Sequence, residues 1–219
     1  MPDPNDTSLI SFNGWTLRVR ESAQPTARLM LLIHGHTGDE SSMWVFARRM
    51  PAHYWMVAPR APYVLESGGY SWRPDQTEHY DQLRPEMLES AAEVLVRLVD
   101  EYSASVGLDA SHFDLMGFSQ GAAVSSVLAF LYPQRIRKAA LLAGFVPPVL
   151  EERLSQRPLE GKPFFAAHGT KDETVPVDRA RASIALLEQA GAHVTYCEDE
   201  VGHKVSAGCL RALQDFFAD

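Results

Sequence analysis

Short strand-like segments alternate with amphipathic segments along most of this chain. Several strand-like segments are continuously apolar, which is typical of strands buried on both faces of a parallel sheet. The predicted strands are Arg28–His34, Tyr54–Ala58, Phe113–Met116, Lys138–Ala143, Phe164–Ala167 and His193–Cys197. The predicted helices are Asp39–Met50, Pro85–Tyr102, Ala122–Leu131, Asp178–Gln189 and Lys204–Phe216. This alternation predicts an α/β fold, a doubly wound and mostly parallel sheet with helices on both faces.

Four segments fall outside the regular alternation. Residues 1–13 are polar and Pro-rich, so we expect a loose N-terminal arm, and the alternating Trp15–Arg20 suits an edge strand. Residues 59–84 carry Pro, Gly and aromatic residues without a clear period, and so long a loop in a compact domain is usually functional. Residues 146–162 are irregular and could form a small cap. No linker stands out, so we expect one domain over residues 1–219.

Composition narrows the function classes. The chain has 219 residues, 46% of them hydrophobic, and a formal net charge of −8, so nucleic acid and anionic membrane are poor partners. Its apolar runs are too short to span a bilayer. The N-terminus lacks the pattern of a secretory signal, so we expect the cytoplasm. Cys197 and Cys209 give no disulfide framework, and a single bridge between them stays open.

The segment Gly117-Phe118-Ser119-Gln120-Gly121 has the form G-x-S-x-G, placed between a predicted strand and a predicted helix. In the α/β-hydrolase fold this context forces the serine into a sharp corner that exposes its hydroxyl. The backbone N–H of Gln120 would lie at the helix N-terminus and could hold a developing oxyanion. The competing interpretation is a turn in which Ser119 only caps the helix. A phosphate-binding loop would need a lysine after the glycines.

A second Gly-rich loop, His34-Gly35-His36-Thr37-Gly38, follows the first buried strand. A loop at this place supplies the other oxyanion N–H in hydrolases, and we assign it to His36, with Thr37 as the alternative. We expect the His34 side chain to brace the loop. A rival interpretation takes His34 and His36, with Asp39 nearby, as ligands of a metal ion.

Among the histidines, His203 has the best context for a general base. It lies in a loop between the last strand and the last helix, at the carboxyl edge of the predicted sheet. The acid should come between serine and histidine in chain order, which selects Asp172. Glu173 is the fallback, and Asp199 and Glu200 are weaker candidates. The three residues predict a serine hydrolase that forms an acyl-enzyme without a metal or organic cofactor.

Six segments in this order, LIHGHTGDE, APRAPY, GGYSW, GFSQGA, HGTKDETVP and VGH, resemble the phospholipase/carboxylesterase family, which includes acyl-protein thioesterases. The resemblance covers nearly the whole chain. It implies carboxyl-ester or thioester hydrolysis by Ser119, Asp172 and His203, in a compact α/β-hydrolase fold with little or no lid. It also implies that Trp72 lies near the acyl pocket, and we expect Tyr70 and Thr37 to contact substrate as well.

The chain departs from the family pattern at two places. Family members often have HGLGD where this chain has HGHTGD, and an extra histidine beside the oxyanion site could alter substrate preference. The segment after Trp72 is polar (Arg73, Asp75, Gln76, Glu78, His79), which argues against a long acyl groove and favours small or medium esters. A thioesterase or lysophospholipase acting on longer chains, a metal-dependent hydrolase using His34 and His36, and a non-catalytic binding protein stay as alternatives. The aromatic residues of 59–84 could serve a homodimer instead of a pocket.

Overall fold

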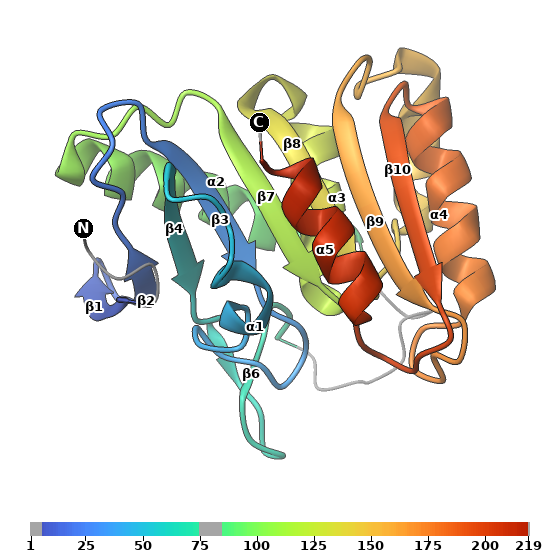
Figure 1. The fold of residues 1–219 in the computed structure, drawn as a ribbon, viewed down its shortest axis with the longest axis horizontal. Helices are drawn as coiled ribbons and strands as arrows, with labels where there is room; N and C mark the ends of the chain where they lie inside the picture. The colour runs from blue at the N-terminus through green and yellow to red at the C-terminus, as the bar shows by residue number, and fades with distance from the viewer. Residues whose placement is uncertain (1–5, 75–84, 219) are drawn as a thin grey trace.

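The chain folds around one eight-stranded sheet in the order β1-β2-β4-β3-β7-β8-β9-β10 (Figure 1). The computed structural model describes residues 6–74 and 85–218. The strands of this sheet are β1 Ser8–Phe12, β2 Trp15–Arg20, β3 Arg28–Ile33, β4 Tyr54–Pro59, β7 Phe113–Phe118, β8 Ile136–Leu142, β9 Pro163–Gly169 and β10 His193–Asp199. In this sheet order, each pair of neighbouring strands from β4 through β3 to β10 is parallel, whereas the pairs β1–β2 and β2–β4 are antiparallel. The expected α/β architecture with a mostly parallel sheet is therefore confirmed.

Helices cover both faces of this sheet. They are α1 Trp44–Ala47, α2 Pro85–Val106, α3 Gln120–Leu131, α4 Val177–Gln189 and α5 Ala207–Phe216. The helices α2, α3 and α4 pack on one face, and α1 and α5 pack on the other (Figure 1). Side chains alternate along β3, so Leu29, Leu31 and Ile33 enter the first core while Met30 and Leu32 enter the second. Burial on both faces explains the continuous apolar runs of the central strands.

The N-terminal arm expected over residues 1–13 is in fact a strand from Ser8 to Phe12, while residues 1–5 lie outside the described part. It pairs antiparallel with β2 through the turn Asn13-Gly14, in which both residues have positive φ (45° and 84°). Asn-Gly is the preferred pair for such a two-residue hairpin turn. This pairing makes β1 the edge of the sheet, so Trp15–Arg20 is not the edge strand that its alternating pattern suggested.

The helix expected over Asp39–Met50 is also shorter than the pattern indicated, because only Trp44–Ala47 is helical. The Asp39 carboxylate accepts hydrogen bonds from Ser41 N and Ser42 Oγ, both at 2.9 Å. Such local side-chain bonds compete with the helical ladder and favour a turn.

The long aromatic loop is partly ordered as a two-stranded hairpin, β5 Tyr63–Val64 and β6 Tyr70–Ser71. The polar residues Asp75, Gln76, Glu78 and His79 lie outside the described residues. The irregular segment at 146–162 contains a 3₁₀ helix, Pro148–Gln156. Among residues 6–74 and 85–218, no helix combines the length and apolarity that crossing a membrane requires.

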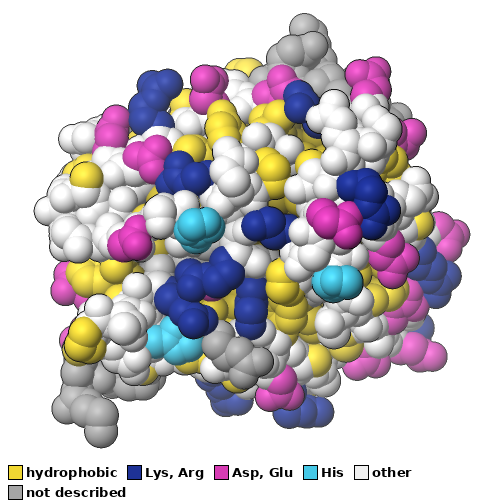
Figure 2. Space-filling model, turned by 90° about the horizontal axis from the view of Figure 1, so that it is seen from above, with side chains coloured by type: hydrophobic (Ala, Val, Ile, Leu, Met, Phe, Trp, Pro, Cys, Tyr) yellow, Lys and Arg dark blue, Asp and Glu magenta, His cyan; other side chains and the backbone are white. Residues whose placement is uncertain are grey.

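The two ends of the sheet differ in character. The parallel strands β3, β7, β9 and β10 all run toward one end, where the loops after Ile33, Phe118, Gly169 and Asp199 gather (Figure 1). The opposite end is seen in Figure 2, where Lys and Arg side chains gather near the middle of the face. The candidate chemistry therefore collects at the carboxyl end, as in other open α/β sheets.

The single disulfide that the sequence alone did not decide is present in the structure. Cys197 in β10 and Cys209 in α5 form a disulfide, with Cα atoms 5.7 Å apart. It joins the last strand to the last helix across the segment that contains His203.

Gly121 offers a sharp test of this packing. A Cβ at Gly121 would lie 2.1 Å from the Ile33 carbonyl oxygen and 2.6 Å from the His34 carbonyl oxygen, so the β3 backbone would have to move. We expect Gly121→Ala to lower the free energy of unfolding by about 3 kcal/mol, measured by urea unfolding.

Gly208→Ala is the matched control, because a Cβ there would meet only Ser206 Oγ at 3.6 Å and Asp199 Oδ2 at 3.8 Å. It should change stability by less than about 1 kcal/mol, toward higher stability, since alanine favours helices. Equal effects of the two substitutions would contradict this account of the β3–α3 contact.

Candidate active site

Ser119 occupies the corner between β7 and α3. Its φ of 53° and ψ of −116° are unusual for a residue other than glycine, and its side chain makes no capping hydrogen bond to α3. The competing interpretation, a serine that only caps the helix, does not agree with this geometry. The Ser119 backbone N–H donates to the carbonyl of Leu142, at the end of β8, at 2.9 Å, and this bond fixes the corner against the neighbouring strand.

The glycines on either side of the corner leave no room for a side chain. A Cβ at Gly117 would lie 2.3 Å from the Gly121 carbonyl oxygen and 2.4 Å from Ser125 Oγ. The strand leading into Ser119 therefore packs directly against the first turn of the helix leaving it. Spacing of glycines two residues before and after the serine is the sequence signature of this contact.

The structure brings Ser119, His203 and Asp172 into one hydrogen-bonded chain. His203 Nε2 lies 2.9 Å from Ser119 Oγ, and His203 Nδ1 lies 2.7 Å from Asp172 Oδ2. A carboxylate only accepts hydrogen bonds, so the ring proton of neutral His203 lies on Nδ1. Nε2 is then left as an acceptor for the Ser119 hydroxyl. The fallback Glu173 and the weaker candidates Asp199 and Glu200 do not take this place.

Asp172 is held by the loop that carries it. Its Oδ1 accepts from the backbone N–H groups of Thr174 and Val175, both at 2.9 Å, and its side chain is fully buried. Backbone donors to one oxygen leave the other for His203. They also compensate the cost of burying a carboxylate.

His168 is a buried neighbour of the acid that the sequence alone did not connect with Asp172. It is 3% exposed, and its Nε2 lies 2.8 Å from the Val175 carbonyl oxygen and 3.4 Å from Asp172 Oδ2. A carbonyl oxygen can only accept, so Nε2 carries the proton. The available signal was its position four residues before Asp172, near the end of β9, the strand that leads into the Asp172 loop.

The loop after β3 passes directly beside the nucleophile. A Cβ at Gly35 would lie 3.2 Å from the Ser119 Cβ, so the chain that continues into His36 runs against Ser119. The turn closes with Gly38 N donating to the Gly35 carbonyl at 3.0 Å, and Thr37 takes a positive φ of 65°. On the other side of Ser119, Gln120 begins α3, so its N–H has no partner within the helix. The segments with both expected oxyanion donors therefore flank the serine.

The Gln120 side chain fastens these segments together through the loop after β6. Gln120 Oε1 accepts from Trp72 N at 3.0 Å, and Gln120 Nε2 donates to Ser71 Oγ at 3.1 Å. Trp72 Nε1 in turn donates to the His34 carbonyl at 2.8 Å. Sequence reasoning missed this role of the Gln120 amide, because nothing in the local pattern places residue 71 beside residue 120.

Trp72, which the resemblance places near the acyl pocket, is buried among the loops that carry Gln120 and His34. It is 1% exposed, and its backbone and indole N–H groups are both bonded to the protein. Its burial supports a role in holding the loops in place. The other expected substrate contacts lie closer to the surface: Thr37 is exposed and Tyr70 is half-buried.

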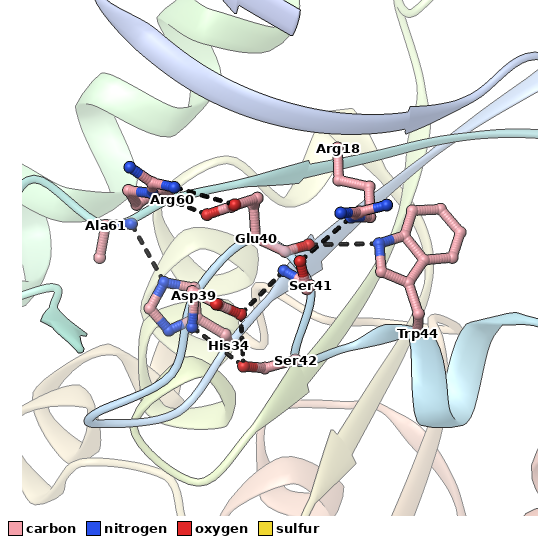
Figure 3. A network of polar contacts seen from close by, with 9 residues as sticks. All are labelled: Arg18, His34, Asp39, Glu40, Ser41, Ser42, Trp44, Arg60 and Ala61. Atoms are coloured by element: carbon pink, nitrogen blue, oxygen red, sulfur yellow. Dashed lines mark hydrogen bonds and ion pairs between the residues drawn. The ribbon is translucent and has the colours of Figure 1, made fainter. Parts of the chain in front are cut away.

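His34 braces the loop as expected (Figure 3). Its Nε2 accepts from Ala61 N at 3.0 Å, so Nδ1 carries the proton and donates to the Gly35 carbonyl at 2.7 Å. Burial is the main cause that lowers the pKa of His34, and the ring stays neutral. Beside it, buried Glu40 pairs with Arg60 through two contacts at 2.7 and 2.9 Å, and Arg60 lies over the Tyr70 ring.

The rival metal site does not fit this donor arrangement. Both ring nitrogens of His34 are used in hydrogen bonds to the backbone, so neither offers a lone pair to a cation. The Asp39 carboxylate is engaged by Ser41 and Ser42. Within residues 6–74 and 85–218, no group of three or more His, Cys, Asp and Glu side chains is arranged to hold a metal ion.

The buried neutral His34 predicts a pH dependence of stability. Its pKa in the folded protein is lowered, whereas in the unfolded chain it is about 6.5. The unfolded state therefore binds more protons between these two values, and the stability that depends on neutral His34 is lost as the pH falls below about 6.5. We expect His34→Asn to be less stable at neutral pH but flatter in its pH dependence, measured by urea unfolding at several pH values. Parallel curves for the two proteins would show that His34 does not contribute this linkage.

Comparison with known proteins supports one family. The sequence model described as Phospholipase/Carboxylesterase matches residues 16–219. Acyl-protein thioesterase 1 of Kluyveromyces lactis is 28% identical over 176 residues, which cover 74% of this chain and 76% of that protein. Carboxylesterase SOBER1 of Arabidopsis thaliana is 30% identical over 127 residues, which cover 55% of this chain and 54% of that protein.

Solved structures agree on the fold. A carboxylesterase from Mesorhizobium loti superposes with a TM-score of 0.80 at 23% identity, covering 97% of this chain and 98% of that one. The carboxylesterase of Bacillus cereus gives the same TM-score and identity, covering 94% of each chain. These likenesses show the α/β-hydrolase fold. Since the family model extends over nearly the whole sequence, from residue 16 to residue 219, the chain belongs to the phospholipase/carboxylesterase family.

Proposed function

We propose that this chain is a serine carboxylesterase that hydrolyses small to medium acyl esters through an acyl-enzyme on Ser119. The observation that carries the proposal is the hydrogen-bonded chain from Ser119 Oγ through the His203 ring to buried Asp172, with distances of 2.9 and 2.7 Å. A base that is hydrogen-bonded to the hydroxyl and oriented by a third group is the arrangement that activates a hydroxyl for attack.

In the proposed mechanism His203 acts first as a base and then as an acid. Nε2 takes the hydroxyl proton as Ser119 Oγ attacks the acyl carbonyl carbon, and the resulting imidazolium is stabilised by Asp172. The same proton passes to the leaving oxygen as the C–O bond breaks and the acyl-enzyme forms. Water then attacks the acyl carbon, gives its proton to Nε2, and the acid is released as Ser119 regains a proton.

The negative oxygen of each tetrahedral intermediate needs donors already in place. We propose the backbone N–H groups of Gln120 and His36, with Thr37 as the alternative to His36. Gln120 N–H gains from the positive end of the α3 dipole. The Gln120 amide, held to Ser71 and Trp72, would keep the two donor segments from separating during the reaction.

The preference for small to medium esters rests on the residues at the entrance to the site. The segment after Trp72 is polar in sequence, and the exposed Thr37 and half-buried Tyr70 lie on the loops at the site.

Hydrolysis of longer acyl thioesters is the second candidate, favoured by the likeness to acyl-protein thioesterase 1. It would use the same three residues, because only the leaving group differs.

The homodimer considered above stays a prediction, to be tested by the molar mass in solution. The cytoplasmic location also stays a prediction, and the Cys197–Cys209 bond bears on it because cytosolic thiols reduce most disulfides.

Substitution of the triad should abolish turnover without unfolding the protein. We expect Ser119→Ala and His203→Ala to lower kcat by about 10⁴-fold or more, and Asp172→Asn to lower it by about 10⁴-fold, since an amide at 172 could favour the wrong His203 tautomer. A fluorophosphonate probe should label the wild type and not Ser119→Ala, read by mass spectrometry.

Ser126→Ala is the matched control for these variants. Ser126 is buried in the same helix, α3, but its hydroxyl bonds to the Ala123 carbonyl and not to the triad. Its kcat should stay within about threefold of the wild type, in line with the small effects of changes away from reacting groups. Turnover that survives unchanged in Ser119→Ala would end the proposed function.

The acyl preference can be measured with a series of nitrophenyl esters and matched acyl thioesters from acetyl to palmitoyl. We expect kcat/KM to peak at short or medium chains, because each further methylene adds affinity only where apolar protein surface receives it. A peak at palmitoyl, with thioesters preferred over esters, would replace this assignment by the thioesterase alternative.

A further inference from the structure

The disulfide of this chain encloses the proposed general base. Cys197 and Cys209 are 12 positions apart, and His203 lies midway between them. The bond therefore closes a small covalent ring whose only loop is the one that presents the imidazole to Ser119.

The upstream half of this loop is held by the loop that carries Asp172. Thr170 N donates to the Asp199 carbonyl at 2.9 Å, and Lys171 N donates to the Val201 carbonyl at 3.0 Å. The contact is close, because a Cβ at Gly169 would lie 2.2 Å from the Val201 carbonyl oxygen. The chain entering His203 is thus fixed relative to Asp172.

The downstream half depends on where α5 begins. Ser206 caps this helix by accepting from Cys209 N at 3.1 Å. The buried side chains of α5, Cys209 and Leu213, form a stripe with Phe217 just after the helix, and Cys209 is the member next to the loop. Leu213 and Phe217 anchor the later turns in the apolar core, while the first turn is tied to β10 through the Cys209 sulfur. The position of the chain leaving His203 therefore rests on the disulfide, together with the hydrogen bond between the Ser206 hydroxyl and the Asp199 carboxylate at the end of β10.

We propose that Cys197 and Cys209 are positioning residues for His203, so that turnover depends on the redox state of their bond. The inference rests on the proposed function, because it assigns the bond to the base of that reaction. With the bond formed, both ends of the loop are fixed and the ring stays within reach of Ser119 and Asp172. With the bond broken, the first turn of α5 can shift, and small displacements of a catalytic group are costly to the rate.

The chemical step is thiol–disulfide exchange with a dithiol reductant. A thiolate of the reductant attacks one sulfur, for which half-buried Cys197 is more accessible than Cys209, whose exposed fraction is 2%. The S–S bond breaks and Cys209 leaves as a thiolate that takes up a proton. The second thiol of the reductant then releases Cys197 and closes its own disulfide, so two electrons and two protons pass to the protein. Re-oxidation by a disulfide oxidant reverses the exchange.

The test compares the full chain before reduction, after dithiothreitol, and after re-oxidation. Free thiols are counted in unfolded samples, where two per chain mark full reduction, since the chain has two cysteines. We expect reduction to lower kcat about tenfold while KM for a nitrophenyl ester changes little, because the base and not the binding surface is displaced. The rate of Ser119 labelling by a fluorophosphonate should fall in parallel, and both should recover on re-oxidation.

Cys197→Ala/Cys209→Val is the matched variant. Valine keeps apolar volume at the buried position in α5, and the variant should show the lower kcat of the reduced enzyme with no response to dithiothreitol. All rates are taken at a temperature where circular dichroism shows every form folded. The downfield proton resonance of His203 Nδ1–H, bonded to Asp172, should broaden or shift on reduction.

Three outcomes overturn the proposal. One is full reduction with kcat and labelling rate unchanged, even if the melting temperature falls, because that marks a purely structural bond. Another is a double variant as active as the oxidised wild type. The third is an equal response to dithiothreitol in the double variant, which would place the effect elsewhere. Turnover unchanged in Ser119→Ala is a separate result that overturns the proposed function itself.

Discussion

The reversal from strand to helix at Ser119 is the constraint on which the rest of the site depends. A residue with φ of 53° at this corner directs its side chain away from both elements, and neighbouring glycines let β7 and α3 pack closely. The cost of such a backbone is of the order of 1–3 kcal/mol, and it persists only because the surroundings fix it. Here those surroundings are the Leu142 carbonyl behind the corner and the β3 backbone against Gly121. The core thus maintains a strained serine at the carboxyl end of the sheet.

Around this corner, the loops are hydrogen-bonded to one another. Backbone groups of the Asp172 loop are hydrogen-bonded to the segment that leads into His203. The Gln120 amide is bonded to the backbone of Trp72, whose indole N–H is bonded to the His34 carbonyl. Neutral His34 and the Glu40–Arg60 pair satisfy polar groups that the close packing has buried. A site assembled from such mutual contacts is already shaped before substrate arrives, which is the condition for stabilising charge in a transition state.

Several features followed directly from the sequence. Continuous apolar runs gave the parallel strands, and G-x-S-x-G between a strand and a helix gave the nucleophile corner, because sterics at that corner act over a few neighbouring residues. Two local patterns were interpreted wrongly, the N-terminal arm and the helix expected over Asp39–Met50. Asn13-Gly14 carries the signal of a hairpin that turns the supposed arm into β1, and the carboxylate of Asp39 shortens the next helix by bonding its own neighbours.

Chain order and residue type were thus enough to choose Ser119, Asp172 and His203, since strands of a parallel sheet deliver their following loops to one edge. Only the tertiary structure decided which side chains share hydrogen bonds there: that His168 reaches Asp172, that Trp72 is buried beneath the loops, and that Cys197 bonds to Cys209. The physical reason is range. Backbone propensity is set by adjacent residues, whereas these contacts form between segments brought together by the packing of whole strands and helices.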